Sequence, residues 1–206
     1  SPLDLAQQFG TPLYVYNETV LRQRCRELKA LSSLPGFGVN YSVKANTNPV
    51  LLRIIREEGL VVDAMSPGEL YMDQLAGFTA DEILYISNNI SEDELRNAVR
   101  HGVLISVDSL SQVETLGRVN PGGKVMVRFN PGIGAGHQVV TAGKETKFGV
   151  SPELLDDLFA ILKKYDLHLA GINQHIGSLF MEADGYIAAA EVLLHLAERL
   201  PADVLE

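Results

Sequence analysis

The feature that most constrains the fold of this chain is a repeated unit in which a short apolar run precedes an amphipathic helix. Six such units follow one another from Val39 onward, and their apolar runs contain few polar residues. Strands that are apolar along nearly their whole length belong to parallel sheets covered on both faces. Their spacing, with a helix between successive runs, indicates βα units. The sequence therefore predicts an α/β fold built on a parallel sheet.

The predicted helices are delimited by capping residues and glycines. Asn48 and Pro49 open one helix as N-cap and first-turn proline, and Gly59 ends it. Ser91 with Glu94 forms a capping box at the start of another helix. Further helices are predicted to begin at Ser66-Pro67, at Ser111 with Glu114, at Ser151-Pro152 and at Tyr186.

Six βα units can be accommodated in two architectures. A doubly wound open sheet would hold six strands, whereas a (β/α)₈ barrel needs eight and typically ~250 residues. A seventh strand begins at Asp203, where the given sequence stops, and this favours an incomplete (β/α)₈ barrel. We expect residues 1–38 to form an N-terminal strand (PLYVY, residues 12–16) and a helix leading into the barrel, and residues 39–206 to form the partial barrel.

Charge and composition argue against several classes of protein. The net charge of −9 lacks the basic footprint of a nucleic-acid binder, and no basic run suggests an anionic membrane surface. No apolar run approaches the ~20 residues of a membrane span, and the N-terminus has no signal-peptide pattern. The single cysteine, Cys25, fits a reducing compartment and is interpreted as a packing residue. We expect a cytoplasmic protein that binds neither nucleic acid nor membrane.

Polar residues stand at the ends of six successive predicted strands. In barrels the active site gathers at this rim. Each residue also has a purely structural interpretation: Asp108 could cap the next helix, Asn88 could form a turn, and Lys44 could pair with Asp63. Taken together, they predict an active site. The residues are Lys44, Asp63, Asn88, Asp108, Arg128 with Asn130, and His175 with Ser178.

Lys44 has the most specific chemistry of this set. A lysine with its stem buried at the end of the strand Val39–Val43 should have a lowered pKa, and its amine would then be a candidate nucleophile for Schiff-base formation. The alternative is a lysine that packs its stem and reaches solvent. Gly177 and Ser178 suit a phosphate, since glycine lets backbone N–H groups approach an anion.

A metal site and a dinucleotide-binding site are two other possibilities for this rim. His175 could be a metal ligand with Asp63 or Asp108, but no HxH, HExxH or Cys/His motif supports a metal site. The glycine-rich stretch of residues 130–150 lacks the helix start of a dinucleotide fingerprint. We expect it to be an active-site loop that carries His137 and Lys147.

Five motifs in order, YSVKAN, DAMSPGEL, RFNP, TKFGV and HIGS, make the chain from Thr11 onward resemble the alanine-racemase-like barrel of the fold type III pyridoxal-phosphate decarboxylases. The resemblance implies that Lys44 holds pyridoxal phosphate as a Schiff base and that His175 stacks on its ring. Gly177 and Ser178 would contact the phosphate. Asp63 and Arg128 would orient the lysine and the ring, and Lys147 would belong to a subunit interface of a homodimer.

The resemblance also implies what the protein acts on. Family members decarboxylate amino acids, among them ornithine, arginine, carboxynorspermidine and diaminopimelate. SPGEL and the 130–150 loop most resemble the members that act on diaminopimelate. The family's second half, with a glycine-rich phosphate turn and a β-domain, is missing from the sequence. We therefore expect a fragment that is inactive alone. A non-catalytic pyridoxal-phosphate barrel and a metal-dependent barrel enzyme remain as alternatives.

Overall fold

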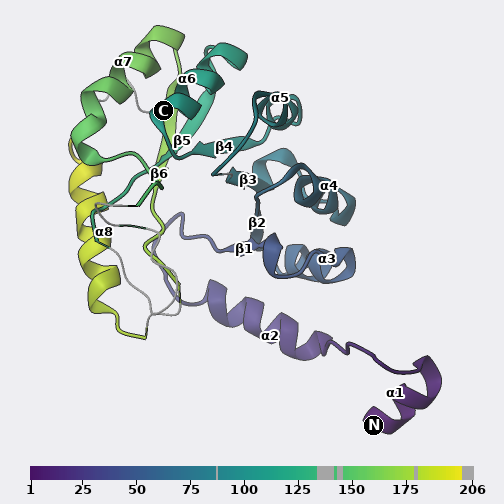
Figure 1. The fold of residues 1–206 in the computed structure, drawn as a ribbon. Helices are drawn as coiled ribbons and strands as arrows, with labels where there is room; N and C mark the ends of the chain where they lie inside the picture. Colours follow the sequence, from purple (N-terminus) through teal and green to yellow (C-terminus); the bar gives the residue numbers. More distant parts are fainter. Residues whose placement is uncertain (87, 134–141, 143–145, 179–180, 201–206) are drawn as a thin grey trace.

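The computed structural model describes residues 1–86, 88–133, 142, 146–178 and 181–200. One parallel sheet in strict sequence order lies at its centre (Figure 1). A doubly wound sheet would reverse its strand order at a switch point, whereas here each strand pairs with the next in the chain. The predicted incomplete barrel is confirmed. The strands are β1 (Asn40–Ser42), β2 (Val61–Ala64), β3 (Ile83–Ile86), β4 (Leu104–Val107), β5 (Lys124–Arg128) and β6 (His168–Asn173).

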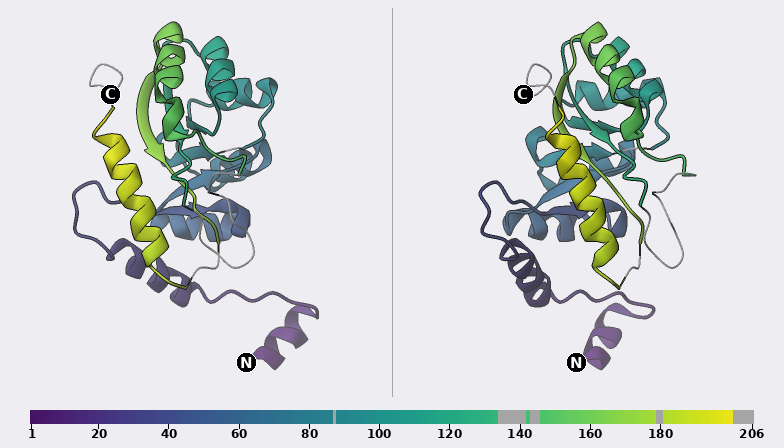
Figure 2. Two further views of the ribbon diagram at one scale, coloured as in Figure 1. Left: turned by 60° about the vertical axis from the view of Figure 1, so that its left-hand side comes forward. Right: turned by 90° about the vertical axis from the view of Figure 1, so that its left-hand side faces the viewer.

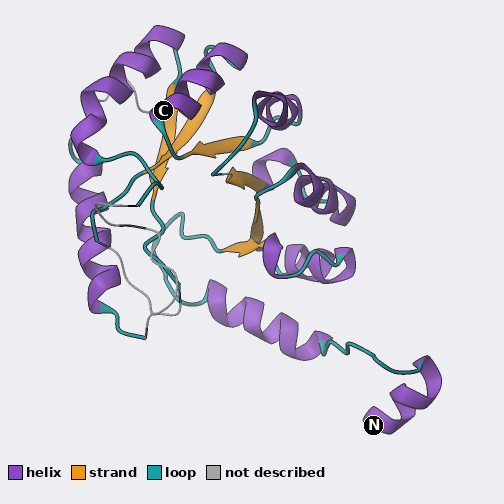
Figure 3. Cartoon of the chain, viewed as in Figure 1, coloured by secondary structure: helices purple, strands orange, loops and turns teal. Residues whose placement is uncertain are grey.

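The helices cover the outer side of the curved sheet (Figure 3). Helix α8 lies beside β6 in both views of Figure 2, while α1 stands apart from the barrel. The helices are α1 (Pro2–Phe9), α2 (Glu18–Lys29), α3 (Pro49–Glu57), α4 (Pro67–Ala76), α5 (Glu92–Arg100), α6 (Leu110–Val119), α7 (Leu155–Tyr165) and α8 (Asp184–Ala197). Short 3₁₀ turns lie at Val43–Ala45 (η1), Ala80–Glu82 (η2) and Pro152–Leu154 (η3).

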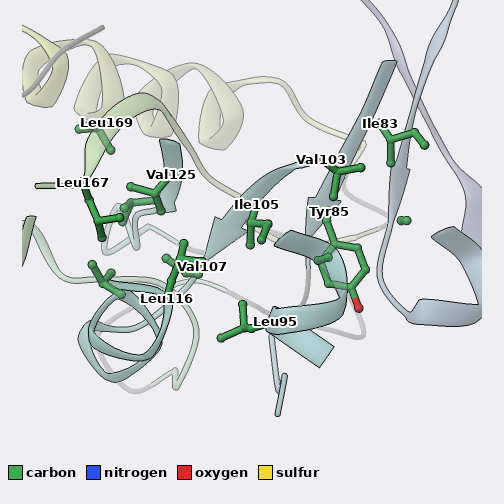
Figure 4. Packing of buried hydrophobic residues seen from close by; sticks show 14 of the residues in the cluster. Ile83, Tyr85, Leu95, Val103, Ile105, Val107, Leu116, Val125, Leu167 and Leu169 are labelled. Atoms are coloured by element: carbon green, nitrogen blue, oxygen red, sulfur yellow. The ribbon is translucent and has the colours of Figure 1, made fainter. Parts of the chain in front are cut away.

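The core lies between the sheet and the outer helices. Alternate strand residues such as Tyr85, Ile105 and Val125 point outward and pack against helix residues such as Leu95 and Leu116 (Figure 4). All five are buried, and burying a large apolar side chain contributes about 1.5–3 kcal/mol. This layer of apolar contacts holds the sheet against the outer helices and therefore fixes the positions of the strand ends.

The inward-facing strand residues are less well covered. Val61, Leu84 and Met126 are only partly buried and line a hollow of about 900 Å³. This hollow lies at the amino ends of the strands, the opposite end from Lys44, so it is the inner space of an open barrel wall. The ionisable rim residues lie at the carboxyl ends of the strands, so the hollow does not contain the candidate site.

The N-terminal region differs from the prediction. Residues 12–16 form no strand in the described structure, and the side chains of Leu13 to Tyr16 are exposed. A strand needs a neighbour with which to pair, and none of the described strands lies beside this segment. Helix α1 was not predicted, although the capping box of Ser1 and Asp4 is a local signal for it. The predicted helix α2 is present and packs against α3.

Two other predictions concern the start of α6 and the last predicted strand. The cap of α6 is Ser109, whose side chain accepts a hydrogen bond from the Gln112 N–H, so neither Asp108 nor Ser111 has that role. Ser109 lies where β4 has just ended, and the helix starts there two residues earlier than predicted. The strand predicted from Asp203 falls outside the described residues.

Candidate active site

Lys44 lies just beyond the end of β1, in the turn η1. The strand ends at Ser42 instead of running to Val43, and the turn closes where the Asn46 N–H donates to the Val43 carbonyl at 3.0 Å. Val43 is fully buried whereas Lys44 is exposed. The prediction of a buried lysine stem was therefore wrong. The turn η1 places the Val43 side chain in the core and leaves the Lys44 side chain accessible to solvent.

Asp63 lies beside Ser42 in the parallel register of β1 and β2. The Ser42 hydroxyl donates to Oδ2 of Asp63 at 2.8 Å. Burial raises the pKa of Asp63, while the Ser42 hydrogen bond and the charge of Lys44 act in the opposite direction. Within the described residues Lys44 and Asp63 form no ion pair, so the structural alternative for these two residues was wrong. Lys44 nevertheless lies close enough for its charge to act on the carboxyl group.

Arg128, the last residue of β5, connects several strand ends. Its side chain is buried, with 4% of its surface exposed. One guanidinium nitrogen donates to Oδ1 of Asn88 at 3.2 Å and another to the backbone carbonyl of His175 at 3.3 Å. The guanidinium also lies 5.1 Å from the centre of the Phe148 ring, a cation–π contact. Arg128 thus links the residues that follow β3 and β6 to the Phe148 segment.

Asp108 follows β4 at the same rim and is nearly as buried as Arg128, with 5% of its surface exposed. Its backbone N–H donates to Oε1 of Gln112 at 3.0 Å. Burial raises the pKa of Asp108, and the positive charges of Arg128 and Lys147 act in the opposite direction. Burial also lowers the pKa of Arg128, which the charge of Asp108 partly offsets. Lys147 therefore lies near the rim, on the predicted loop, whereas His137 falls outside the described residues.

His175, Gly177 and Ser178 follow β6. His175 is exposed overall, but partial desolvation lowers the pKa of its imidazole, and the charges of Arg128 and Lys44 lower it further. The structure thus brings Lys44, Arg128 and His175 into one electrostatic neighbourhood. Gly177 is buried and has a φ of 142°, a backbone conformation that residues with a side chain rarely adopt. Ser178, next to it, is exposed.

Three contributors to this site were missed in the sequence. Ser42 holds Asp63, and Phe148 lies against Arg128. The third is Glu69 of α4, whose carboxylate accepts a hydrogen bond from the Met65 N–H at 2.7 Å. The register of β1 and β2 could have identified Ser42. The contact of Phe148 depends on how a long loop returns to the rim, which has no local signal.

Among the residues that the structure describes, no group of three or more histidine, cysteine, aspartate or glutamate side chains could hold a metal ion. Within the same ranges, no helix combines the length and the apolar character that crossing a membrane would need.

A family model and two curated relatives match nearly the whole chain. Residues 19–203 match the family model described as "Pyridoxal-dependent decarboxylase, pyridoxal binding domain". The chain is 40% identical to a diaminopimelate decarboxylase of Methanothermobacter thermautotrophicus over 96% of this chain and 47% of that protein. It is 34% identical to the diaminopimelate decarboxylase of Bacillus subtilis, over 92% of this chain and 46% of that protein.

Solved structures resemble the same part of the chain. The crystal structure of diaminopimelate decarboxylase from Helicobacter pylori complexed with L-lysine matches with a TM-score of 0.90 and 25% identity, over 96% of this chain and 52% of that one. A lysine/ornithine decarboxylase from Vibrio vulnificus complexed with putrescine matches with a TM-score of 0.81 and 25% identity, over 96% and 51%. The chain spans about half the length of the curated relatives that it matches.

Proposed function

Because the chain belongs to the family of pyridoxal-dependent decarboxylases, as its pyridoxal-binding domain, we propose that it is the barrel part of a diaminopimelate decarboxylase. This enzyme would convert diaminopimelate to lysine and carbon dioxide. The observation that carries the proposal is the convergence of Lys44, Asp63, Arg128 and His175 on one rim of a barrel. The relatives named diaminopimelate decarboxylase support the choice of substrate.

The chemical groups at this rim fit pyridoxal phosphate, which is the cofactor that the family implies. Lys44 supplies an accessible primary amine, the group that binds an aldehyde carbon. His175 supplies a flat ring that can lie against an aromatic one. Gly177 supplies a backbone with no side chain to block an anion, and the exposed hydroxyl of Ser178 is a hydrogen-bond donor for a phosphate.

When bound, pyridoxal phosphate supplies an electron sink for the electron pair that remains when carbon dioxide leaves the substrate. The chain's own residues would orient the reacting groups. Asp63, held by Ser42, presents its carboxyl group near the Lys44 amine and can orient it. The lowered pKa of His175 favours its neutral imidazole.

Arg128 would act as the anchor of this arrangement. Its hydrogen bond to the His175 carbonyl fixes the backbone from which the imidazole and the Gly177-Ser178 turn project. Its hydrogen bond to Asn88 ties the same guanidinium to the residues after β3. Preorganised groups of this kind lower a barrier because they need no rearrangement at the moment of reaction.

The assembly and the location of the protein belong to the same proposal. We propose a homodimer in the cytoplasm, with Lys147 at the subunit interface that the family resemblance implies. No nucleic acid or membrane is needed as a partner. The alternative substrates ornithine and arginine are tested directly in the experiment below.

The test is borohydride trapping of pyridoxal phosphate on the full-length protein. After reduction and digestion, mass spectrometry should locate the pyridoxyl group on Lys44, and Lys44→Ala should remove the label. Lys147→Ala, a lysine of the same rim, is the matched control and should leave Lys44 labelled. Release of carbon dioxide from diaminopimelate, ornithine and arginine is measured in parallel. A label on another lysine, or turnover of ornithine or arginine alone, would contradict the proposal.

A further inference from the structure

Asp73 is an ionisable residue that is fully buried in the described part of the chain. It lies on the inner face of α4, beside the buried Leu70 and Ala76, and 0% of its surface is exposed. Within the described structure neither of its carboxylate oxygens has a hydrogen-bond partner. A buried carboxylate without a partner is strongly disfavoured. The geometry therefore favours the protonated form of Asp73 while α4 stays packed.

The charges around Asp73 reinforce this requirement. Glu69 lies one helical turn earlier on α4, where side chains four residues apart are neighbours. Asp63 projects from β2, which packs against α4. Burial, followed by the charges of Glu69 and Asp63, raises the pKa of Asp73 to about 7.

Among the residues that the structure describes, no cation acts on the pKa of Asp73. On α3, Arg56 binds Glu82 and lies beside Gly77 at the far end of α4. In the turn η1, the charge of Lys44 acts on Asp63. On β3, the pKa of Tyr85 is raised to about 12 by burial and by the negative charges of Glu94 on α5 and Glu69 on α4. At the end of α5, the His101 ring contacts the Gln74 side chain of α4 at 2.8 Å, and it does not act on Asp73.

The position of α4 matters to the active site. Helix α4 packs against both η1, which carries Lys44, and β2, which carries Asp63. At the start of α4, Glu69 holds the Met65 N–H directly after β2. A negative charge on Asp73 would repel both Glu69 and Asp63, so it would act on the junction that positions these residues.

We propose that Asp73 is a pH-sensitive latch on α4. With its proton, it lets α4 lie against the turn that carries Lys44. When it loses the proton, repulsion from Glu69 and Asp63 loosens α4 and alters the surroundings of Lys44. The proposal extends the proposed function only in its effect on Lys44, and its effect on α4 is independent of any cofactor.

The sign of the pH effect follows from linkage. A carboxyl whose pKa is raised in the folded state contributes stability that is fully present below its ordinary pKa and is lost as pH rises through the folded value. Opening of α4 should therefore become about tenfold more frequent for each pH unit from about pH 5 to 7. It should level off above about pH 7, where both open and closed forms have lost the proton.

Hydrogen–deuterium exchange of a peptide covering α4, in the full-length protein, tests this directly. The ratio of exchange rates between wild type and Asp73→Asn removes the chemical pH dependence, and this ratio should rise about tenfold per unit up to about pH 7. Asp73→Leu is a second variant that has no titratable group at this position, and it should give the same profile. Asp157→Asn, an exposed aspartate on α7, is the control and should give a flat ratio. A flat ratio for both Asp73 variants overturns the proposal.

Trapping at Lys44 supplies the second measurement. The rate of borohydride-fixed labelling of wild type relative to Asp73→Asn should fall as pH rises from about 5.5 to 7.5. A constant labelling ratio beside a pH-dependent exchange ratio would confine Asp73 to helix stability and would overturn the latch. If wild type is not labelled at Lys44 at any pH, the proposed function fails, while the exchange measurement still decides whether Asp73 controls α4.

Discussion

At the scale of single residues, the site is governed by the charges around His175. Both Lys44 and Arg128 lower its pKa, in addition to burial. Replacing the exposed Lys44 by methionine removes one of these charges without disturbing the core, so Lys44→Met should raise the pKa of His175. NMR titration of the histidine ring resonances measures the change. Lys147→Met is the matched control, since Lys147 does not act on this imidazole, and it should leave the midpoint in place.

The same residue predicts how stability depends on pH. Because the pKa of His175 is lowered in the folded state, the stability that it contributes is present above its ordinary value of 6.5 and is lost as pH falls. Lys44→Met should reduce that loss. An unchanged or lower His175 midpoint in Lys44→Met would mean that the two side chains are farther apart than the structure has them.

At the scale of elements, α6 and α7 meet at Gly117, where the chain cannot accommodate a larger residue. A Cβ at this position would lie 2.4–2.8 Å from atoms of Tyr165. The Tyr165 hydroxyl donates to Glu114 at 2.7 Å, so the ring is held in place. Gly117→Ala should therefore lower the free energy of unfolding by about 1 kcal/mol, because overpacking of about 1–3 kcal/mol exceeds the gain in helix propensity of about 1 kcal/mol.

Urea unfolding of a double-mutant cycle checks this prediction. In a Tyr165→Ala background the ring is absent, so the same Gly117→Ala substitution should become neutral or stabilising by up to about 1 kcal/mol. An equal loss in both backgrounds would show that the cost has another origin than the α6–α7 contact.

Elements also show which features could be predicted from sequence. The starts of α3, α4 and α5 were predicted correctly because Asn48, Ser66 and Ser91 satisfy the first N–H groups of their own helices, which is a local interaction. The prediction of a strand at residues 12–16 was wrong because a strand must pair with a segment that is distant in the sequence. The predicted cap of α6 was wrong because Ser109 and Ser111 are both suitable N-cap residues. The position at which β4 ends determines which of them caps the helix.

The same division holds for the site. Lys44, Asp63, Arg128 and His175 could be selected as candidates from the sequence, because a parallel barrel puts every strand end at one rim and the order along the chain is then enough. The exposure of Lys44 was not predicted, since it follows from the turn η1, which buries Val43 and leaves Lys44 outside the core. Asp73 gave no signal at all, because its burial arises from the packing of α4 against other elements.

At the scale of the whole molecule, the six-stranded wall has one well-packed side and one open side. Outward residues such as Val62, Val107 and Val127 are fully buried, whereas inward residues such as Leu84 and Met126 are only partly covered. A cofactor on the rim of such a wall would be in contact with protein on one side and with solvent on the other. Contacts from further strands would desolvate it and strengthen every polar interaction that holds it.

We therefore expect the full-length protein to bind pyridoxal phosphate more tightly than this 206-residue chain alone, by about tenfold or more, which corresponds to about 1.4 kcal/mol. Titration of cofactor fluorescence in both proteins measures the two dissociation constants. Lys44→Ala in each protein separates covalent attachment from the remaining contacts. If the two affinities are equal, the six strands hold the cofactor by themselves, and the exposed Lys44 is already in its working environment. If only the longer protein binds, closure of the barrel is what converts the open rim into a site.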